Sequence, residues 1–510
     1  MEWLQSYSDL GSHLLSLLRY DASSPITLAG ALFLFLYSIF GLGYLAVRRV
    51  RLLRTIYVVL FSLFFYYKLS GVYVLLLLAV ALSDYIIGRC VSRCRERGRP
   101  SGAWVALSVV INLSILIYFK ASDIIFEAIA SLYHGGTLDW QSVVVPAGVS
   151  FFVFQSIAYV VDISRGVIAP LRRFVDYLFL LSFFPKMFLG PLVKAKDFIP
   201  QIEAPRLSVT KEDIGRAVTL IATGLIKYAV IAKSLGLLLV SPGFGGEYGD
   251  GGGVALMAIL GFTLQIYCDF SGYSDMAVGI ALLLGFRLPD NFDAPYKSAT
   301  ITEFWHRWHI SLSQWLRDYL YISLGGNRRG VLRTYLNLMI TMILGGLWHG
   351  VGLTFLAWGA LHGVALALHK LWMRLIPWAK AAGEQMNILL RIPSTIITFI
   401  VVAFGWLLFT ASDMAMVEDV VQRICYNFAW SDFVALYDSA PVALIILAVG
   451  YISHFMPRAI NLGLQRAVTR TGFVGAWLFV VVAIWITMEC GALLAAYTGG
   501  DAGLPIYAAF

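Results

Sequence analysis

Long apolar segments recur along the whole chain and are separated by short polar or basic loops. Roughly 20 apolar residues are what an α-helix needs to cross the hydrocarbon core of a membrane. The pattern therefore predicts an all-α polytopic membrane protein with about eleven transmembrane helices. The apolar segments number thirteen, because hydropathy does not separate re-entrant pieces from full spans, and they are about Pro25–Val47, Thr55–Tyr67, Leu69–Gly88, Ala103–Phe119, Val143–Gly166, Leu180–Phe198, Ile214–Val240, Ala255–Phe286, Thr334–Gly350, Gly352–Leu371, Pro393–Thr410, Pro441–Met456 and Gly472–Tyr497.

Two of these segments carry residues that are unusual inside a membrane helix. Val143–Gly166 contains Pro146 and Asp162, and Leu180–Phe198 contains Lys186 between two prolines. Broken or re-entrant helices are tolerated in membranes only where protein or a watery cavity covers their backbone. We therefore expect both segments to be broken helices around a central tunnel. The chain shows no clear repeat, so we expect one domain over residues 1–510.

Composition agrees with a membrane protein and excludes a soluble domain. Hydrophobic residues make up 59% and charged residues 13% of the 510 residues, with a mean hydropathy of +0.77. The net charge of +8 does not indicate nucleic-acid binding, because the basic residues lie in short loops. Two arginine clusters, Arg48–Arg54 and Arg89–Arg99, flank an apparent hairpin. The positive-inside rule makes that side cytoplasmic and predicts an extracytoplasmic N-terminus.

Ionisable residues at membrane depth are costly and usually serve a function. Asp269 and Asp275 lie six apart in CDFSGYSD, with Ser271 between them. They either help helices to pack, as small and polar residues do in membranes, or support a site built by other residues. Five scattered cysteines provide no recognisable metal site.

The stretch Ile301–Gly350 concentrates three of the eight histidines and four tryptophans. Glu303 and His306 form an E-x-x-H pair, but a di-iron bundle needs a second such pair, which the chain lacks. His306 and His309 could share a metal, yet zinc sites usually recruit a third ligand, and none is evident. The loop GGNRRG lacks the G-K-[ST] ending of a nucleotide-binding loop. We therefore expect no metal.

His349 lies in GGLWHG, roughly 24 Å along a predicted helix from the basic loop at 1.5 Å per residue. Its flanking glycines leave room for a substrate, and Trp348 supplies an apolar wall. A lone buried histidine is more often structural. Because histidine exchanges a proton near neutral pH, His349 can alternatively serve as a general base for a hydroxyl.

Several long motifs resemble the membrane-bound O-acyltransferase family. They are PAGVSFFVFQSIAYVVDISRG, FFPKMFLGPLVKAKDFIPQI, YCDFSGYSDMAVGIALLLGFRLPDNFDAPY, ITEFWHRWHISLSQWLRDYLYISLGGNRRG and RTYLNLMITMILGGLWHG. The sequence is similar to a bacterial branch that includes an alginate O-acetyltransferase membrane subunit. The resemblance is densest over residues 145–363, which we take as the catalytic core. It implies an integral membrane enzyme that moves an acyl group to a hydroxyl.

The resemblance also implies two catalytic histidines, which map onto His349 and His309. His306 departs from the family, in which arginine is usual at this position. We predict that further residues of the same motifs support the site: Asp269, Ser271, Asp275, His306, Arg317, Asp318, Asn337 and Trp348.

In the expected mechanism, a thioester donor such as acetyl-CoA approaches from the cytoplasm, and no cofactor is tightly bound. His349 acts as general base on the acceptor hydroxyl, while His309 positions or polarises the acyl group. The resemblance implies the bacterial inner membrane with its lipids, an extracytoplasmic partner protein that completes transfer, and an alginate-like polysaccharide acceptor. D-alanyl transfer to teichoic acid and acetylation of peptidoglycan are the alternatives within acyl transfer. A transporter or flippase is the alternative of another class, since broken helices with buried acids are typical of transporters.

Overall fold

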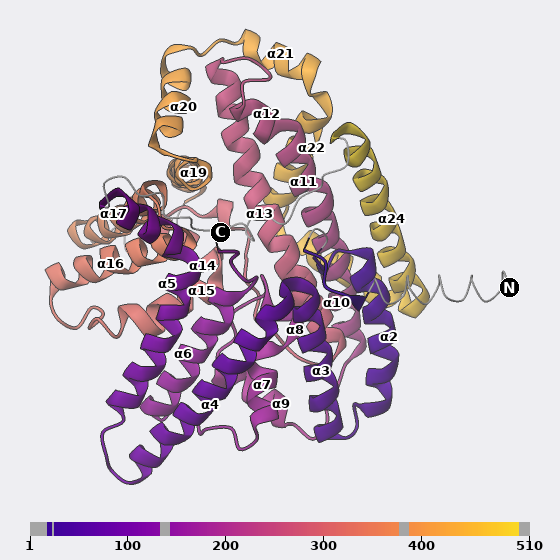
Figure 1. The fold of residues 1–510 in the computed structure, drawn as a ribbon. Coiled ribbons are helices and arrows are strands. Elements are labelled where there is room, and N and C mark those ends of the chain that lie inside the picture. Colours follow the sequence, from indigo (N-terminus) through magenta and orange to yellow (C-terminus); the bar gives the residue numbers. More distant parts are fainter. Residues whose placement is uncertain (1–17, 23–24, 133–142, 377–386, 499–510) are drawn as a thin grey trace. The chain divides into compact units, whose positions relative to one another are not determined.

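The computed structural model describes residues 18–22, 25–132, 143–376 and 387–498, and the regular structure in these ranges is entirely helical (Figure 1). The prediction of an all-α protein is confirmed. Internal contacts divide the chain into two compact units, residues 1–208 and 209–510. The boundary falls within the predicted catalytic core, and the expectation of a single domain stays a prediction.

Unit 1 consists of the helices that precede Val209. They are α2 (Ala31–Val47), α3 (Arg51–Ser70), η1 (Gly71–Tyr73), α4 (Val74–Glu96), α5 (Gly102–Leu132), α6 (Val149–Arg165), α7 (Phe174–Ser182), α8 (Phe184–Met187) and α9 (Ala195–Glu203). Gly71 separates α3 from α4 with a φ of +60°, a left-handed value that glycine adopts without steric cost. The predicted N-terminal orientation concerns residues outside the described ranges.

Unit 2 begins with α10 (Lys211–Leu225), π-helical η2 (Ile226–Ala232), α11 (Lys233–Leu235), π-helical η3 (Gly236–Val240), α12 (Ser241–Phe244) and α13 (Gly252–Leu283). Its middle contains η4 (Pro295–Lys297), α14 (Ile301–Arg307), α15 (Ile310–Trp315), π-helical η5 (Leu316–Tyr321), α16 (Val331–His349) and α17 (Leu353–Leu375). It ends with α19 (Ile388–Thr410), α20 (Met414–Tyr426), α21 (Ser431–Ser439), α22 (Pro441–Phe455), α23 (Arg458–Arg470) and α24 (Gly472–Thr498).

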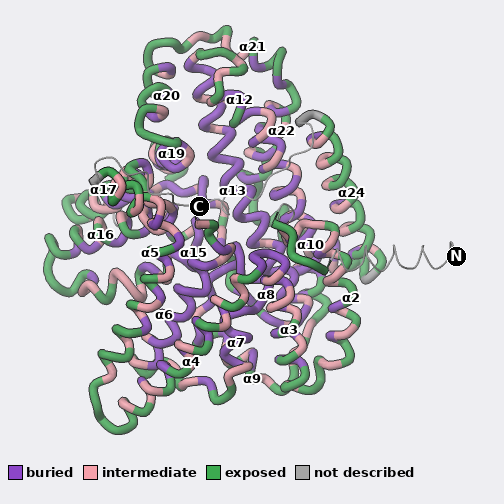
Figure 2. The backbone as a smooth tube through the Cα atoms, viewed as in Figure 1, coloured by how far each residue is buried: buried purple, intermediate pink, exposed green. Residues whose placement is uncertain are grey.

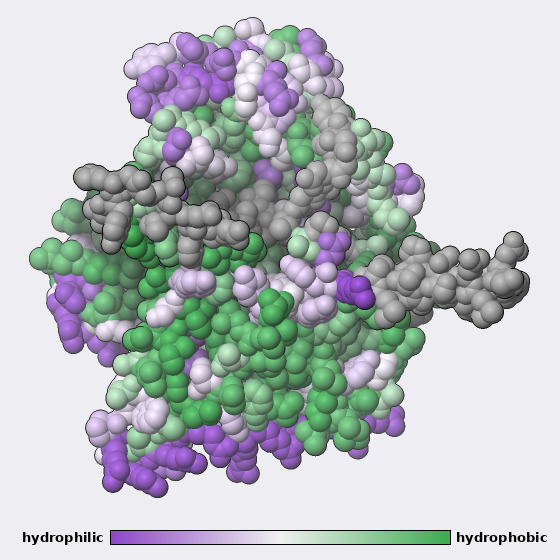
Figure 3. Space-filling model, viewed as in Figure 1, coloured by the Kyte–Doolittle hydropathy of each residue, from purple (hydrophilic) through white to green (hydrophobic). Residues whose placement is uncertain are grey.

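Seven helices in the described ranges are long and apolar enough to cross a membrane, or eight if the bent pair α21 and α22 counts as one span. The chain is a multi-pass membrane protein, but the predicted count of about eleven spans is not confirmed. One reason is that the predicted segment Leu180–Phe198 forms parts of three short helices. Figure 3 shows apolar side chains over α16 and hydrophilic ones around α20 and α21.

Helix α13 forms the centre of unit 2. Of its most apolar 18-residue stretch, 83% is buried, whereas only 11% of the corresponding stretch of α24 is buried. Figure 2 shows this contrast as a buried α13 and a largely exposed α24. Helices α10, α19, α20 and η2 all pack against α13. A buried central helix can hold polar side chains in place, and α13 carries several of those predicted to support the site.

Of the two segments predicted to be broken, Leu180–Phe198 is interrupted between α7, α8 and α9, whereas residues 149–165 of the other segment form the single helix α6. Helix α6 begins only after Gly148, whose φ is +71°. The buried Lys186 on α8 donates a hydrogen bond to Gln155 Oε1 of α6 at 3.2 Å. Gln155 Nε2 in turn donates to the Val193 carbonyl at 2.6 Å. The irregular backbone is therefore tied to α6, as membrane burial requires.

Candidate active site

His309 lies at a sharp break between α14 and α15. Its φ is +41°, one of two positive values among described residues other than glycine. This left-handed conformation is uncommon for residues other than glycine, although histidine adopts it more often than most. His309 is fully buried, and the Phe270 ring of α13 lies edge-on to it with centroids 4.6 Å apart. Such an outlier, held by its surroundings, is typical of functional positions.

Asn291 holds the imidazole of His309. Its Oδ1 lies 3.2 Å from His309 Nδ1 and also accepts hydrogen bonds from the Ser311 backbone N–H at 3.2 Å and the Ser311 hydroxyl at 2.8 Å. A backbone N–H can only donate, so the Asn291 atom it meets is the oxygen. His309 Nδ1 must then carry the proton, which leaves Nε2 as the acceptor nitrogen of the neutral ring.

Burial lowers the pKa of His309 from 6.5 to about 3. The cause is desolvation, which disfavours the charged imidazolium. At neutral pH the ring is therefore neutral, with a lone pair on Nε2. It can accept a hydrogen bond or a proton there, but it cannot donate one from the same nitrogen.

The two aspartates predicted to support the site have other surroundings. Asp275 forms an ion pair with Lys227 of η2 at 2.7 Å, and both side chains are about a quarter exposed. Asp269 is buried on α13, as is Ser271. Helix α13 reaches His309 instead through Phe270 and through Ser274, whose hydroxyl lies 3.3 Å from Asn291 Nδ2. The link from Asp275 to Lys227 favours the helix-packing interpretation for Asp275.

His349 is the last residue of α16, as predicted for a helix that ends at this motif. It is 4% exposed and is enclosed by the rings of Trp348, Trp358 and Phe409 at centroid distances of 4.6, 5.4 and 5.0 Å. Gly350 follows it, and a Cβ there would come within 2.3 Å of the Phe355 ring. A glycine is therefore needed for α17 to approach the end of α16.

Aromatic rings connect the surroundings of the two histidines. The Trp358 ring packs against His349, and its centroid lies 6.2 Å from that of Trp406. The Trp406 centroid lies 4.6 Å from that of Trp308, the neighbour of His309 in the chain. His362 of α17 lies in the same cluster, 4.8 Å from Trp358 and fully buried. The sequence had not singled out His362 or Asn291. The position of Asn291 in the motif LPDNFDAPY was the one available signal.

A cavity of ≈ 480 Å³ lies beside this aromatic cluster. Trp305 lines it and also contacts both Trp358 and His362, at centroid distances of 5.8 and 5.2 Å. His306 and Arg317, both predicted site residues, line the cavity together with Lys370. Serine, threonine and glutamine side chains complete its polar lining: Thr302, Ser313, Gln314 and Thr341. The structure thus separates exposed His306 from buried His309, although the two are three residues apart.

The remaining predicted residues shape the loop that precedes α16. Asn337 is fully buried and donates to the carbonyls of Gly326 at 2.9 Å and Leu324 at 3.4 Å, which fixes the glycine-rich loop against α16. Asp318 lies on π-helical η5, beside Arg317. In the described ranges, no group of three or more histidine, cysteine or acidic side chains is arranged to hold a metal ion.

Comparison with known proteins identifies relatives over most of the chain. The sequence model of the membrane-bound O-acyltransferase family matches residues 171–410. The chain is 38% identical to "Probable alginate O-acetylase AlgI" of Pseudomonas putida, over 75% of this chain and 76% of that protein. The Azotobacter vinelandii protein of the same name is 36% identical over 83% of each chain. A peptidoglycan O-acetyltransferase of Helicobacter pylori is 32% identical over 75% of this chain and 76% of that protein.

Proposed function

Because the chain belongs to the membrane-bound O-acyltransferase family, we propose that it transfers acetyl groups from a thioester donor towards hydroxyls of an extracytoplasmic polysaccharide. The relatives named for alginate acetylation support the acetyl group and an alginate-like acceptor. The protein would work in the bacterial inner membrane with its N-terminus outside. An extracytoplasmic partner protein would complete the transfer.

The observation that carries this proposal is the pair of buried histidines within one aromatic cluster. His349 would take the proton of the acceptor hydroxyl as its oxygen attacks the thioester carbonyl. The C–S bond then breaks, and the leaving thiolate receives that proton from His349. Proton transfer of this kind contributes about 10²–10⁴-fold to rate. Aromatic walls exclude water, which would otherwise hydrolyse the thioester.

His309 would position a substrate rather than polarise an acyl oxygen. Its Nδ1 proton is committed to Asn291, and the neutral ring has only a lone pair at Nε2. That nitrogen can accept a hydrogen bond from a substrate N–H or O–H group. Of the two roles expected for His309, the geometry supports positioning.

The cavity beside the cluster suits the donor. Arg317 and Lys370 supply positive charge, and the remaining polar side chains supply hydrogen bonds. Phosphate groups of an acetyl-CoA donor would find charge-assisted partners there. A central tunnel from this cavity to the acceptor side stays a prediction.

The test is transfer of radiolabelled acetyl groups from acetyl-CoA in membranes that contain the full-length protein and its polysaccharide acceptor. His349→Ala should abolish incorporation at equal protein level, and His309→Ala should reduce it strongly. Gln422→Ala is the control, because Gln422 is an exposed residue of α20 that bonds to Glu418 and lies in neither the aromatic cluster nor the cavity lining. Undiminished acetylation by His349→Ala would refute the role of His349 as general base. No incorporation of label by the wild type would favour a transporter.

Peptidoglycan is the second candidate acceptor, because a peptidoglycan O-acetyltransferase is 32% identical over three quarters of the chain. Mass analysis of envelope glycans from a deletion strain distinguishes the two. If acetyl groups are lost from muramic acid while the exopolysaccharide is unchanged, the acceptor is peptidoglycan rather than an alginate-like polymer. Loss of D-alanyl esters would indicate teichoic acid.

A further inference from the structure

A second cavity, of ≈ 710 Å³, lies in unit 2, and its lining shares no residue with the cavity proposed for the donor. Its walls are mostly apolar and come mainly from α19 and α22, with Leu260 of α13 and Tyr296 of η4. The apolar lining consists of Leu260, Ile388, Ile392, Ile396, Phe399, Tyr451 and Phe455. We call this cavity the α19 groove.

One wall of the α19 groove is an exposed apolar stripe. Ile388, Ile392 and Ile396 are spaced four residues apart on α19 and therefore lie on one helix face. They are 63%, 54% and 54% exposed. Helix α19 is a candidate membrane span, so this stripe is suited to contact a hydrocarbon chain.

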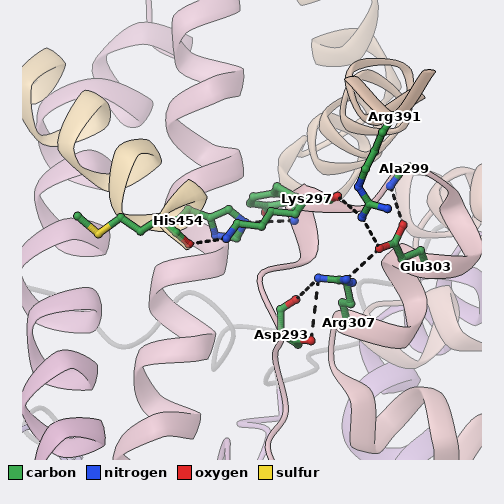
Figure 4. A network of polar contacts seen from close by, with 9 residues as sticks. Asp293, Lys297, Ala299, Glu303, Arg307, Arg391 and His454 are labelled. Carbon is green, nitrogen blue, oxygen red and sulfur yellow. Dashed lines mark hydrogen bonds and ion pairs between the residues drawn. The ribbon is translucent and has the colours of Figure 1, made fainter. Parts of the chain in front are cut away.

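Cationic side chains line the same groove. They are Lys297 of η4, Arg307 of α14 and Arg391 of α19. Figure 4 shows Arg391 reaching from α19 towards Glu303, while the Lys297 side chain extends the other way, to the Met456 carbonyl. Glu303 Oε1 lies 2.9 Å from Arg391 and 2.9 Å from Arg307, while Asp293 is 4.0 Å from Arg307. Three cations thus face two carboxylates in this cluster.

The excess positive charge is centred on Lys297. Its Nζ donates to the Met456 carbonyl at 2.6 Å, and within the described ranges no carboxylate lies within ion-pair distance of it. Burial and the neighbouring Arg307 lower the pKa of Lys297, although Asp293 raises it. A further negative charge at this point would therefore be stabilised by both Lys297 and Arg307.

We propose that the α19 groove binds an anionic phospholipid, with an acyl chain along the Ile388–Ile396 stripe and the phosphate beside the Lys297 ammonium. Apolar walls and a cationic end match the two parts of such a lipid. An acetyl thioester has no long chain to occupy the walls, and a free phosphate ion would leave them empty. The site does not depend on which acceptor the enzyme acetylates.

Lipid binding to the purified full-length protein tests this, by native mass spectrometry in detergent with phosphatidylglycerol, phosphatidylcholine and inorganic phosphate as probes. Phosphatidylglycerol should bind at least about tenfold tighter than phosphatidylcholine, as expected for charge-assisted hydrogen bonds. Equal affinity for the two lipids would overturn the proposal. Displacement of phosphatidylglycerol by equimolar inorganic phosphate would also overturn it, because the cations alone would then account for binding.

Variants locate the site. Lys297→Gln with Arg391→Gln should remove the preference for phosphatidylglycerol, whereas Arg466→Gln, an exposed cation on α23, should leave it unchanged. Glu303→Gln should act in the opposite direction and tighten phosphatidylglycerol binding, because Arg307 and Arg391 lose their shared carboxylate. Ile396→Trp fills the groove and should weaken the binding of both lipids. This readout stands even if the double variant does not fold. Unchanged binding by Ile396→Trp would place the lipid elsewhere.

Discussion

Replacing Asn291 tests whether the tautomer of His309 matters for acetyl transfer. Asn291 Oδ1 accepts from His309 Nδ1 and twice from Ser311, so Asn291→Leu leaves buried donors without their acceptor. Each buried group that loses its hydrogen bond costs about 1–3 kcal/mol. Losing that acceptor also allows the proton of His309 to move to Nε2. A preference of about 1–3 kcal/mol for the Nδ1–H form corresponds to about 5–150-fold in population.

We therefore expect Asn291→Leu to lower kcat for acetyl transfer by about 10–100-fold, with a smaller change in KM for the donor. Asn291→Asp is the matched control, because a carboxylate accepts the same hydrogen bonds and keeps the Nδ1–H form. A carboxylate also stabilises the imidazolium, so the acid limb of the pH–rate profile should move to higher pH in Asn291→Asp. A merely structural role for Asn291 would lower the melting temperature without this shift.

The assay is initial-rate transfer of labelled acetyl in proteoliposomes, normalised to folded protein from size-exclusion chromatography. If Asn291→Leu keeps the kcat of the wild type, the tautomer argument is refuted, because the His309 ring would then not need Asn291 Oδ1 as its acceptor. Equal loss in Asn291→Leu and Asn291→Asp would also refute it, because the aspartate retains the hydrogen bonds.

Three further predictions follow from the same structure. Gly359→Ala should lower the melting temperature, with a cost of about 1–3 kcal/mol, because its Cβ would come within 2.6 Å of the Met342 carbonyl; Gly491→Ala on α24, with no atom within 4 Å, is the control and should leave it unchanged or raise it. The folded state holds His309 neutral, with its pKa lowered from 6.5 to about 3, so the contribution of the neutral ring to stability is present above pH 6.5 and lost as the pH falls towards 3. Between pH 6.5 and 5 the wild type should therefore lose about 2 kcal/mol more unfolding free energy than His309→Asn, measured by chemical denaturation. Equal losses in the two proteins would contradict this. Arg317→Gln with Lys370→Gln should raise KM for acetyl-CoA about tenfold at similar kcat in steady-state assays, whereas an unchanged KM would exclude the cavity as the donor site.

The helical class followed from the spacing of apolar segments, but the number of spans did not. Hydropathy averages over a window, so it cannot separate a full span from several short helices. The segment at Lys186 shows why: its side chain bonds to Gln155 on a different helix. Only tertiary contacts of this kind decide where a buried chain can break.

The possibility that His306 and His309 share a metal assumed a continuous helix. Residues at i and i+3 share a face only while the helix continues. The backbone turns into the left-handed region at His309, and neither glycine nor proline marks the break in HRWHIS. His309 is instead oriented by Asn291, 18 residues earlier, a contact that no local pattern encodes. The spacing of Asp269 and Asp275 was more informative, because six residues place two side chains on different helix faces.

The aromatic cluster links the two histidines to the cavity proposed for the donor by packing rather than by charge. Trp305 forms part of the cavity wall and contacts Trp358, and Trp358 contacts His349. A donor that fills the cavity would press on Trp305, and close-packed rings transmit such a displacement because interiors have little free volume. The same rings exclude water, and burial lowers the pKa of His309, so its imidazole is in the neutral form that can accept a proton. The apolar residues around His349 and His309 are therefore part of the proposed chemistry, and enlarging the space beside His349 with Trp358→Leu should slow acetyl transfer even though no proton-transferring group is removed.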